Sequence, residues 1–347
     1  MSQRLGRAER WPLACRRATC PSSTDFGERK SPAMLRTHTL ARRFTRFRAL
    51  LLLPLAFAAA CDNTDALDPS NSITPEESGV EILSVEPEVA NASFAGGIPI
   101  GMAAQPVNAF GNRFNGGKRT ISPNQLLSDL AGIRSRGGRV VVMFAGHPRN
   151  YQDGDRHFSL TKWKSEVDEF KRINFSSYIN DGTIIGHYLM DEPNDPRNWG
   201  GKPVSASTVE EMAKYSKQLW PSMATIVRTQ PDYLNRDHRY LDAAWATYLF
   251  RRGNVNEYIR DMVSAAQSRG LQLVVGLNVL RGGNPNGTKM TANELESWGS
   301  ALLSSSYPCA FMMWEWNTSY LSSSGIPNAM DALRRRAENR GNKSCRS

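Results

Sequence analysis

The sequence has few cysteines and histidines, five of each among 347 residues, and it lacks the motifs that hold common cofactors. Neither an HExxH nor a CxxC pattern occurs, so the usual metal-ligand spacings are missing. No GxGxxG or GxxxxGK loop follows the first apolar run of the folded region, as a phosphate site would require. We therefore expect no metal ion and no cofactor.

A basic surface for nucleic acid is also missing from most of the chain. The net charge is +10, but residues 1–60 hold twelve Lys and Arg against three Asp and Glu. That surplus of nine leaves about +1 for residues 61–347. A nearly neutral body argues against a nucleic-acid partner.

No apolar run is long enough to span a bilayer. The longest near the N-terminus, 49–60, has about twelve residues, whereas a span needs roughly 20. It follows basic residues and ends in small ones, so residues 34–60 are predicted to be a signal peptide and 1–33 an upstream extension without a fold. The ending "FAAACD" resembles a bacterial lipobox, which implies a lipid anchor at Cys61 and a periplasmic or cell-surface lipoprotein. The alternative is ordinary signal cleavage, which leaves Cys61 free.

Residues 61–96 are rich in Ser, Asn, Pro and acids, and we expect them to form a flexible linker. Within this linker only Val80–Val85 has strand character. Two other cysteines of the exported chain remain to pair in an oxidising compartment. Cys309 opens the last predicted strand, and the helix that follows should return Cys345 to the same end of the domain. The sequence thus predicts a Cys309–Cys345 disulfide.

From residue 97 onward, apolar runs alternate with helical stretches, as in βα units around a parallel sheet. The predicted strands are 98–105, 139–146, 183–193, 224–231, 242–249, 271–280 and 309–317. The predicted helices are 122–136, 160–179, 207–219, 255–269, 292–304 and 327–340. Length and rhythm favour a single (β/α)8 TIM barrel over 97–347, with a doubly wound open sheet as the alternative. The strand count is seven from residue 98, or eight if Val80–Val85 is included.

The active site of such a barrel forms at the carboxyl ends of its strands. Two predicted strands run into glutamates there, Glu192 in "HYLMDEP" and Glu315 in "FMMWEWN". Two facing carboxylates suit glycosidic-bond cleavage, in which one donates a proton and the other attacks the sugar or activates water. Strand alternation predicts that Glu192 points into the barrel and that Asp191 turns toward the helices. Other residues expected at this end are His147, Arg149, Asp191, Arg228, Gln230, Asp232, Trp245, Tyr248, Asn278, Trp314, Trp316 and Asn317.

The stretch "IIGHYLMDEP" resembles the strand-end Asn-Glu-Pro or Asp-Glu-Pro motif of retaining (β/α)8 glycoside hydrolases. The resemblance implies that Glu192 is the general acid/base. "MMWEWN" is similar to the strand that supplies the nucleophile in those enzymes, which would assign that role to Glu315. In that superfamily the two residues lie on the fourth and seventh strands. Here they lie four strands apart, which places Glu315 on an eighth.

This departure leaves two alternatives open. Asn278, Asp232 or Asp242 replaces Glu315 in a different mechanism, or the pocket binds sugar without cleaving it. In the second case the protein is a non-catalytic surface glycan-binding lipoprotein with a carbohydrate ligand. The tryptophans near Glu315 fit either a sugar platform or barrel packing.

Overall fold

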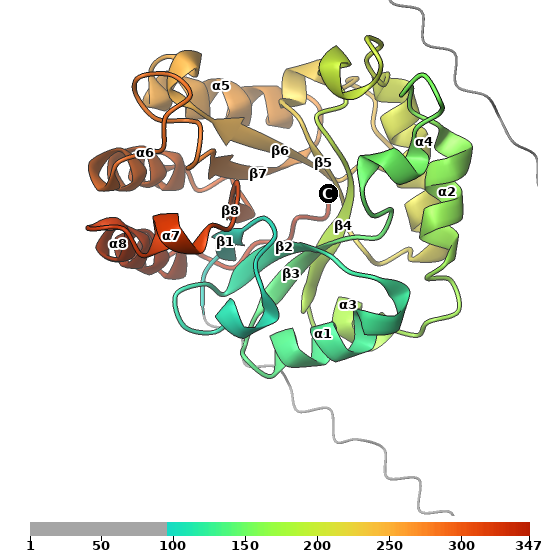
Figure 1. The fold of residues 1–347 in the computed structure, drawn as a ribbon, viewed down its shortest axis with the longest axis horizontal. Coiled ribbons are helices and arrows are strands. Elements are labelled where there is room, and N and C mark those ends of the chain that lie inside the picture. The colour runs from blue at the N-terminus through green and yellow to red at the C-terminus, as the bar shows by residue number, and fades with distance from the viewer. Residues whose placement is uncertain (1–95) are drawn as a thin grey trace, which may run out of the picture. The chain divides into compact units, whose positions relative to one another are not determined.

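Eight parallel strands form the centre of residues 96–347, the part of the chain that the computed structural model describes (Figure 1). They are β1 (Ile100–Met102), β2 (Gly116–Thr120), β3 (Arg139–Met143), β4 (Ile184–Asp191), β5 (Thr225–Arg228), β6 (Ala243–Tyr248), β7 (Gln272–Leu277) and β8 (Ala310–Met313). From β2 to β8 each strand pairs with the next, and β1 pairs with β8. A bridge between Ala103 and Lys118 joins β1 to β2 and closes the sheet. The predicted (β/α)8 barrel is confirmed.

Helices surround the strands (Figure 1). The α-helices are α1 (Leu126–Arg134), α2 (Leu160–Asp168), α3 (Ser176–Asn180), α4 (Ala206–Leu219), α5 (Val255–Gln267), α6 (Ala292–Ser304), α7 (Thr318–Leu321) and α8 (Ile326–Glu338). The short 3-10 helices are η1 (Val107–Ala109), η2 (Pro123–Gln125), η3 (Pro148–Tyr151), η4 (Pro196–Asn198), η5 (Pro231–Tyr233) and η6 (Phe250–Arg252). The helix predicted over 160–179 is divided into α2 and α3. The side chain of Asn174 accepts a bond from the amide of Ser176, a local turn that competes with a continuous helix.

All seven strands predicted from residue 98 onward are present, and the eighth is β2. The sequence of β2 is "GGKRT", which has no apolar alternation and so gave no strand signal. Gly101 of β1 allows close contact with β2, because a Cβ on Gly101 would lie 1.8 Å from the carbonyl oxygen of Gly116. Glu192 therefore follows the fourth strand and Glu315 the eighth. The predicted extension, signal peptide, Cys61 and Val80–Val85 strand lie outside the described residues.

The C-terminal tail lies at the amino ends of the strands, opposite the expected site. Cys309, just before β8, forms a disulfide with Cys345, and their Cα atoms are 5.2 Å apart. The amide of Ser347 donates to the carboxylate of Asp242, just before β6, at 3.2 Å. The end of the chain thus lies near the barrel axis in Figure 1. Within residues 96–347, no helix is both long enough and apolar enough to cross a membrane.

Candidate active site

Two neighbouring cavities at the carboxyl ends of the strands contain most of the predicted site residues. The larger one, here the central cavity, has a volume of about 740 Å³. Its lining includes six residues that the sequence predicted, namely Asp191, Glu192, Arg228, Asn278, Trp314 and Glu315. The second, here the β3 cavity, has a volume of about 600 Å³. Both glutamates of the predicted pair therefore face one cavity, from strands on opposite sides of the barrel.

Glu192 has an unusual backbone conformation. Its φ is +39°, in the left-handed region that non-glycine residues rarely adopt. Its amide donates to the carbonyl of Arg228 at 2.9 Å, and its carbonyl accepts from the indole of Trp199 and the amide of Asp195, both at 3.0 Å. Strained residues that neighbouring groups hold in place cluster at functional sites. This position has the properties expected of a functional carboxylate.

Arg228, at the end of β5, pairs with both carboxylates of the Asp191-Glu192 dipeptide. Its Nη1 lies 2.5 Å from Oδ1 of Asp191, and its Nη2 lies 3.4 Å from Oε1 of Glu192. Burial alone would lower the pKa of Arg228, but the two carboxylates and Tyr188 raise it above its usual value. The Arg228 side chain is 6% exposed and that of Glu192 is 41% exposed, so the glutamate remains accessible. Arg228 is thus a buried, permanently charged group at the base of the cavity.

The predicted outward direction of Asp191 is wrong. Asp191 lines both cavities and accepts a hydrogen bond from the hydroxyl of Tyr188 at 3.0 Å. The pairing of β4 with β5 shifts register between Tyr188 and Asp191, and such an irregularity reverses the alternation of side chains. Asp191 and Glu192 consequently both reach the mouth of the barrel.

Lys118 on β2 is a buried cation that the sequence analysis missed. Its Nζ lies 4.8 Å from the ring centroid of Tyr188 and donates to Thr120 Oγ1 and Met143 Sδ, each at 3.3 Å. Burial lowers the pKa of Lys118 to about 8, while Asp191 and Glu315 partly oppose this shift. Lys118 therefore belongs to the same electrostatic group as the carboxylates above it.

Trp314 follows β8 and carries Glu315 to the cavity. Its amide donates to the carbonyl of Leu277 at 2.8 Å, which extends the pairing of β8 with β7 by one residue. The Arg228 guanidinium lies 4.3 Å from the ring centroid of Trp314. That cation covers part of one indole face, so only the remaining surface of Trp314 is open to a ligand. The peptide bond between Trp314 and Glu315 is cis.

Trp245 and Tyr248, both predicted to bind substrate, are core residues. Trp245 is 0% exposed, and its indole donates to the carbonyl of Met312 at 3.2 Å. Tyr248 is 2% exposed, and its hydroxyl donates to the carbonyl of Gly253 at 2.7 Å. Both assignments are wrong, because a fully buried ring cannot stack on a sugar.

Trp316 and Asn317 lie outside the lining of both cavities. The ring of Trp316 packs edge-on against Phe114 at 5.8 Å, and Asn317 caps α7 by accepting from the amide of Tyr320 at 2.8 Å. Of the alternatives to Glu315, Asp242 lies at the opposite end of the barrel. Asp232, in η5, lies outside the lining of the central cavity, whereas Asn278 contributes to it.

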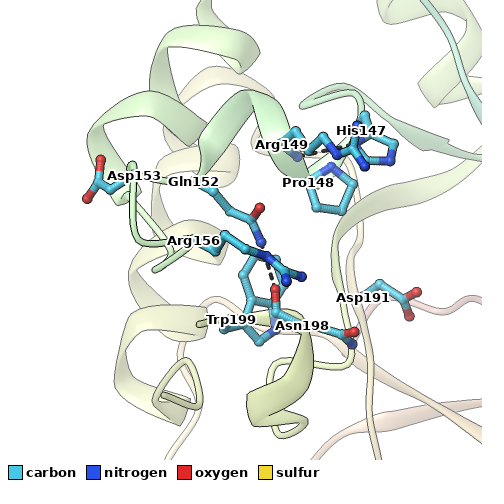
Figure 2. A pocket seen from close by; sticks show the side chains of 9 residues that line it. All are labelled: His147, Pro148, Arg149, Gln152, Asp153, Arg156, Asp191, Asn198 and Trp199. Carbon is cyan, nitrogen blue, oxygen red and sulfur yellow. Dashed lines mark hydrogen bonds between the residues drawn. The ribbon is translucent and has the colours of Figure 1, made fainter. Parts of the chain in front are cut away.

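His147 and Arg149 line the β3 cavity, at the start of the β3–α2 connection (Figure 2). The Nδ1 atom of His147 accepts from the amide of Arg149 at 3.2 Å. The cavity also contains Arg156 and Asn198, and the backbone carbonyl of Asn198 accepts from the side-chain Nε2 of Gln152 at 2.7 Å. His147 and Arg149 therefore lie beside the central cavity, on the other side of Asp191.

The sequence analysis also missed three arginines of the central cavity, namely Arg197, Arg251 and Arg281. Each lies in the connection that follows a strand, after β4, β6 and β7 respectively. Their positions in the connections after predicted strands were the signal in the sequence that could have identified these arginines. Among the described residues, no group of three or more His, Cys, Asp or Glu side chains could hold a metal ion.

No protein-family model matches the chain, and no curated protein matches it either. Among solved structures, a putative alpha-L-fucosidase from Bacteroides thetaiotaomicron has 12% identity and a TM-score of 0.47, covering 70% of this chain and 94% of its own. A GH18 chitinase from Pseudoalteromonas aurantia has 11% identity and a TM-score of 0.44, covering 69% and 99%. A D-psicose 3-epimerase from Clostridium cellulolyticum has 13% identity and a TM-score of 0.39, covering 70% and 96%. These similarities are too distant to indicate a reaction.

Proposed function

We propose that the protein is a glycoside hydrolase that cleaves glycosidic bonds in an oligo- or polysaccharide. One observation carries this proposal: Glu192 and Glu315 reach one cavity from opposite strands of the barrel. Paired carboxylates at the mouth of a barrel suit proton donation to the leaving oxygen and attack on the sugar carbon. The strained, hydrogen-bonded backbone of Glu192 supports a functional role for its carboxylate.

In this mechanism Glu192 is the general acid/base, and Glu315 is the nucleophile or the base that activates water. Asp191 is held by Arg228 and Tyr188, so it acts as a fixed charge that orients Arg228. Arg228 in turn contacts Glu192 and limits the positions of its carboxylate. Asn278 and the open part of Trp314 remain to contact the sugar.

A second candidate is a glycan-binding protein that does not cleave its ligand. The contact between Arg228 and Glu192 favours this candidate, because the guanidinium 3.4 Å away engages an oxygen of the carboxylate that cleavage would need at the glycosidic oxygen. Both candidates are consistent with a carbohydrate ligand in the central cavity. They differ in whether Glu192 transfers a proton.

A hydrolysis assay separates them. The purified full-length chain and its Glu192→Gln variant are incubated with a panel of polysaccharides, and the released reducing ends are measured. We expect the variant to be at least ~10²-fold slower, because the amide keeps the shape but cannot transfer the proton. Glu169→Gln, at an exposed glutamate just after α2, is the matched control and should keep wild-type activity. A wild-type rate in Glu192→Gln would show that the acid assignment is wrong.

We also propose that the protein is exported and anchored by lipid at Cys61. The basic, apolar and small-residue order of 34–61 supports this, and a Cys309–Cys345 disulfide suits an oxidising compartment. The mature form should begin at Cys61 and partition with membranes into detergent. Recovery of the unprocessed chain as a soluble cytoplasmic protein from its host would contradict the proposal.

A further inference from the structure

The central cavity and the β3 cavity meet at the end of β4. Both are lined by Asp191 and Asn198, so these two residues separate neighbouring spaces of about 740 and 600 Å³. Figure 2 shows Asp191 and Arg156 on facing sides of the β3 cavity. Together the cavities extend over the mouth of the barrel on both sides of Asp191. A chain of several sugars has room to lie across them.

Exposed arginines without an ion-pair partner line each cavity. Arg251 and Arg281 line the central cavity, and Arg149 and Arg156 line the β3 cavity. Within residues 96–347 none of these four forms a salt bridge, although all four are exposed to solvent. Arg197 is different, because it is paired with Asp195 at 2.5 Å. The mouth of the barrel therefore presents arginines without a salt-bridge partner on both sides of Asp191.

The acids of the same cavities cancel this charge only in part, because the two linings together hold six arginines against four acids, Asp153, Asp191, Glu192 and Glu315. Asp191 is already paired with Arg228, and Asp153 with Lys162 at 3.0 Å. Glu192 also has Arg228 nearby. A cleft with a surplus of one sign of charge attracts ligands of the other sign. Since the body of the chain carries a net charge of only about +1, this distribution is a local property of the cleft.

We propose that the ligand of this cleft is an anionic glycan, with carboxylate or sulfate groups on sugars on both sides of Asp191. The guanidinium group matches both anions, because its parallel N–H donors bind two oxygens of a planar or tetrahedral oxyanion. This inference rests on the proposed function, since it names the substrate class of the same site. The arginines of the central cavity bind one part of the glycan, and those of the β3 cavity bind the other.

Binding to a catalytically silent protein tests this proposal. The full-length chain with Glu192→Gln and Glu315→Gln is titrated calorimetrically with an oligogalacturonate, a sulfated carrageenan oligosaccharide and neutral maltohexaose. We expect at least one anionic probe to bind about tenfold or more tightly than the neutral one, and to weaken as salt is raised. Comparing the affinities of the oligogalacturonate and the carrageenan oligosaccharide shows whether carboxylate or sulfate is preferred.

Arginine variants in that background locate the binding. Arg251→Gln with Arg281→Gln, and separately Arg149→Gln with Arg156→Gln, should each weaken the anionic probe about five- to tenfold. Arg172→Gln, at an exposed arginine outside both cavities, is the matched control and should leave affinity unchanged. The inference would be overturned if the neutral probe bound as tightly as the anionic ones, or if neither anionic probe bound. It would also be overturned if the arginine variants had the same affinity as the control. Because binding is measured without turnover, failure of hydrolysis in the earlier assay does not affect this result.

Discussion

At Glu192, function and backbone energy are in conflict. A residue with a Cβ at a φ of +39° has an unfavourable conformation, at a cost of order 1 kcal/mol or more. The surrounding hydrogen bonds to Arg228, Asp195 and Trp199 nevertheless fix the chain there. A glycine would adopt the same backbone without this cost, but it has no carboxylate. Glu192 thus supplies a carboxylate at a position whose backbone conformation favours glycine.

This conflict can be measured with two variants that both lack the carboxylate. Glu192→Gly should be more stable than Glu192→Ala by about 1 kcal/mol, because only the alanine keeps a Cβ at positive φ. Both should be inactive. Urea unfolding gives the comparison, with the wild-type chain as reference. If the alanine variant is as stable as the glycine variant, the left-handed backbone is not a source of strain.

The sequence predicted individual site residues best where a strand ends in a polar group. Glu192, Glu315 and Arg228 were found in this way, and they share the central cavity. The rule failed for Trp245, because an apolar strand does not show how deep in the barrel each ring lies. Strand alternation gave the wrong direction for Asp191, because it does not reveal the register shift between β4 and β5. Of the residues that line the β3 cavity, the sequence predicted His147, Arg149 and Asp191.

Among the elements, strands with buried apolar runs were predictable and β2 was not. Seven strands carry apolar runs buried on both faces, whereas β2 has two glycines and two cations in five residues. Its pairing depends on tertiary contacts, such as the approach of Gly101 to Gly116 and the burial of Lys118. Such contacts bring together segments that the sequence pattern treats separately. Because β2 has no apolar pattern, Val80–Val85 was considered as the eighth strand in its place.

Close strand contact also occurs between β7 and β8, and it can be tested at Gly276. A Cβ there would lie 1.7 Å from the carbonyl oxygen of Met312, which also accepts a hydrogen bond from the indole N–H of Trp245. We expect Gly276→Ala to destabilise the fold by about 3 kcal/mol or more, since neither backbone can move without disturbing the sheet. Gly154→Ala is the control, because a Cβ at Gly154 meets nothing within 4 Å. Thermal unfolding of the two variants should differ clearly, and equal midpoints would contradict this packing argument.

For the whole domain, the disulfide connects the last strand to the end of the chain. It closes a loop with a sequence separation of 36 residues. Removing such a disulfide lowers the free energy of unfolding by about 2–4 kcal/mol, because the unfolded chain gains conformational entropy. The double variant Cys309→Ala, Cys345→Ala should unfold at correspondingly lower urea than the oxidised wild type. Reductant should lower the wild-type midpoint toward that of the variant and leave the variant unchanged, whereas a reductant-insensitive wild type would contradict the prediction.

The same bond gives the polypeptide a ring-like covalent topology around Glu315. The ring contains β8, Glu315, α7 and α8, and its exposed turn at 322–325 is its most accessible part to a protease. A single cut in that turn opens the ring without dividing the molecule, because Cys345 still holds the severed C-terminal segment to Cys309. The nicked protein would migrate as one species until it is reduced. Its barrel could then keep α8 in place with Glu315 still attached to β8, so one proteolytic event need not release any part of the active site.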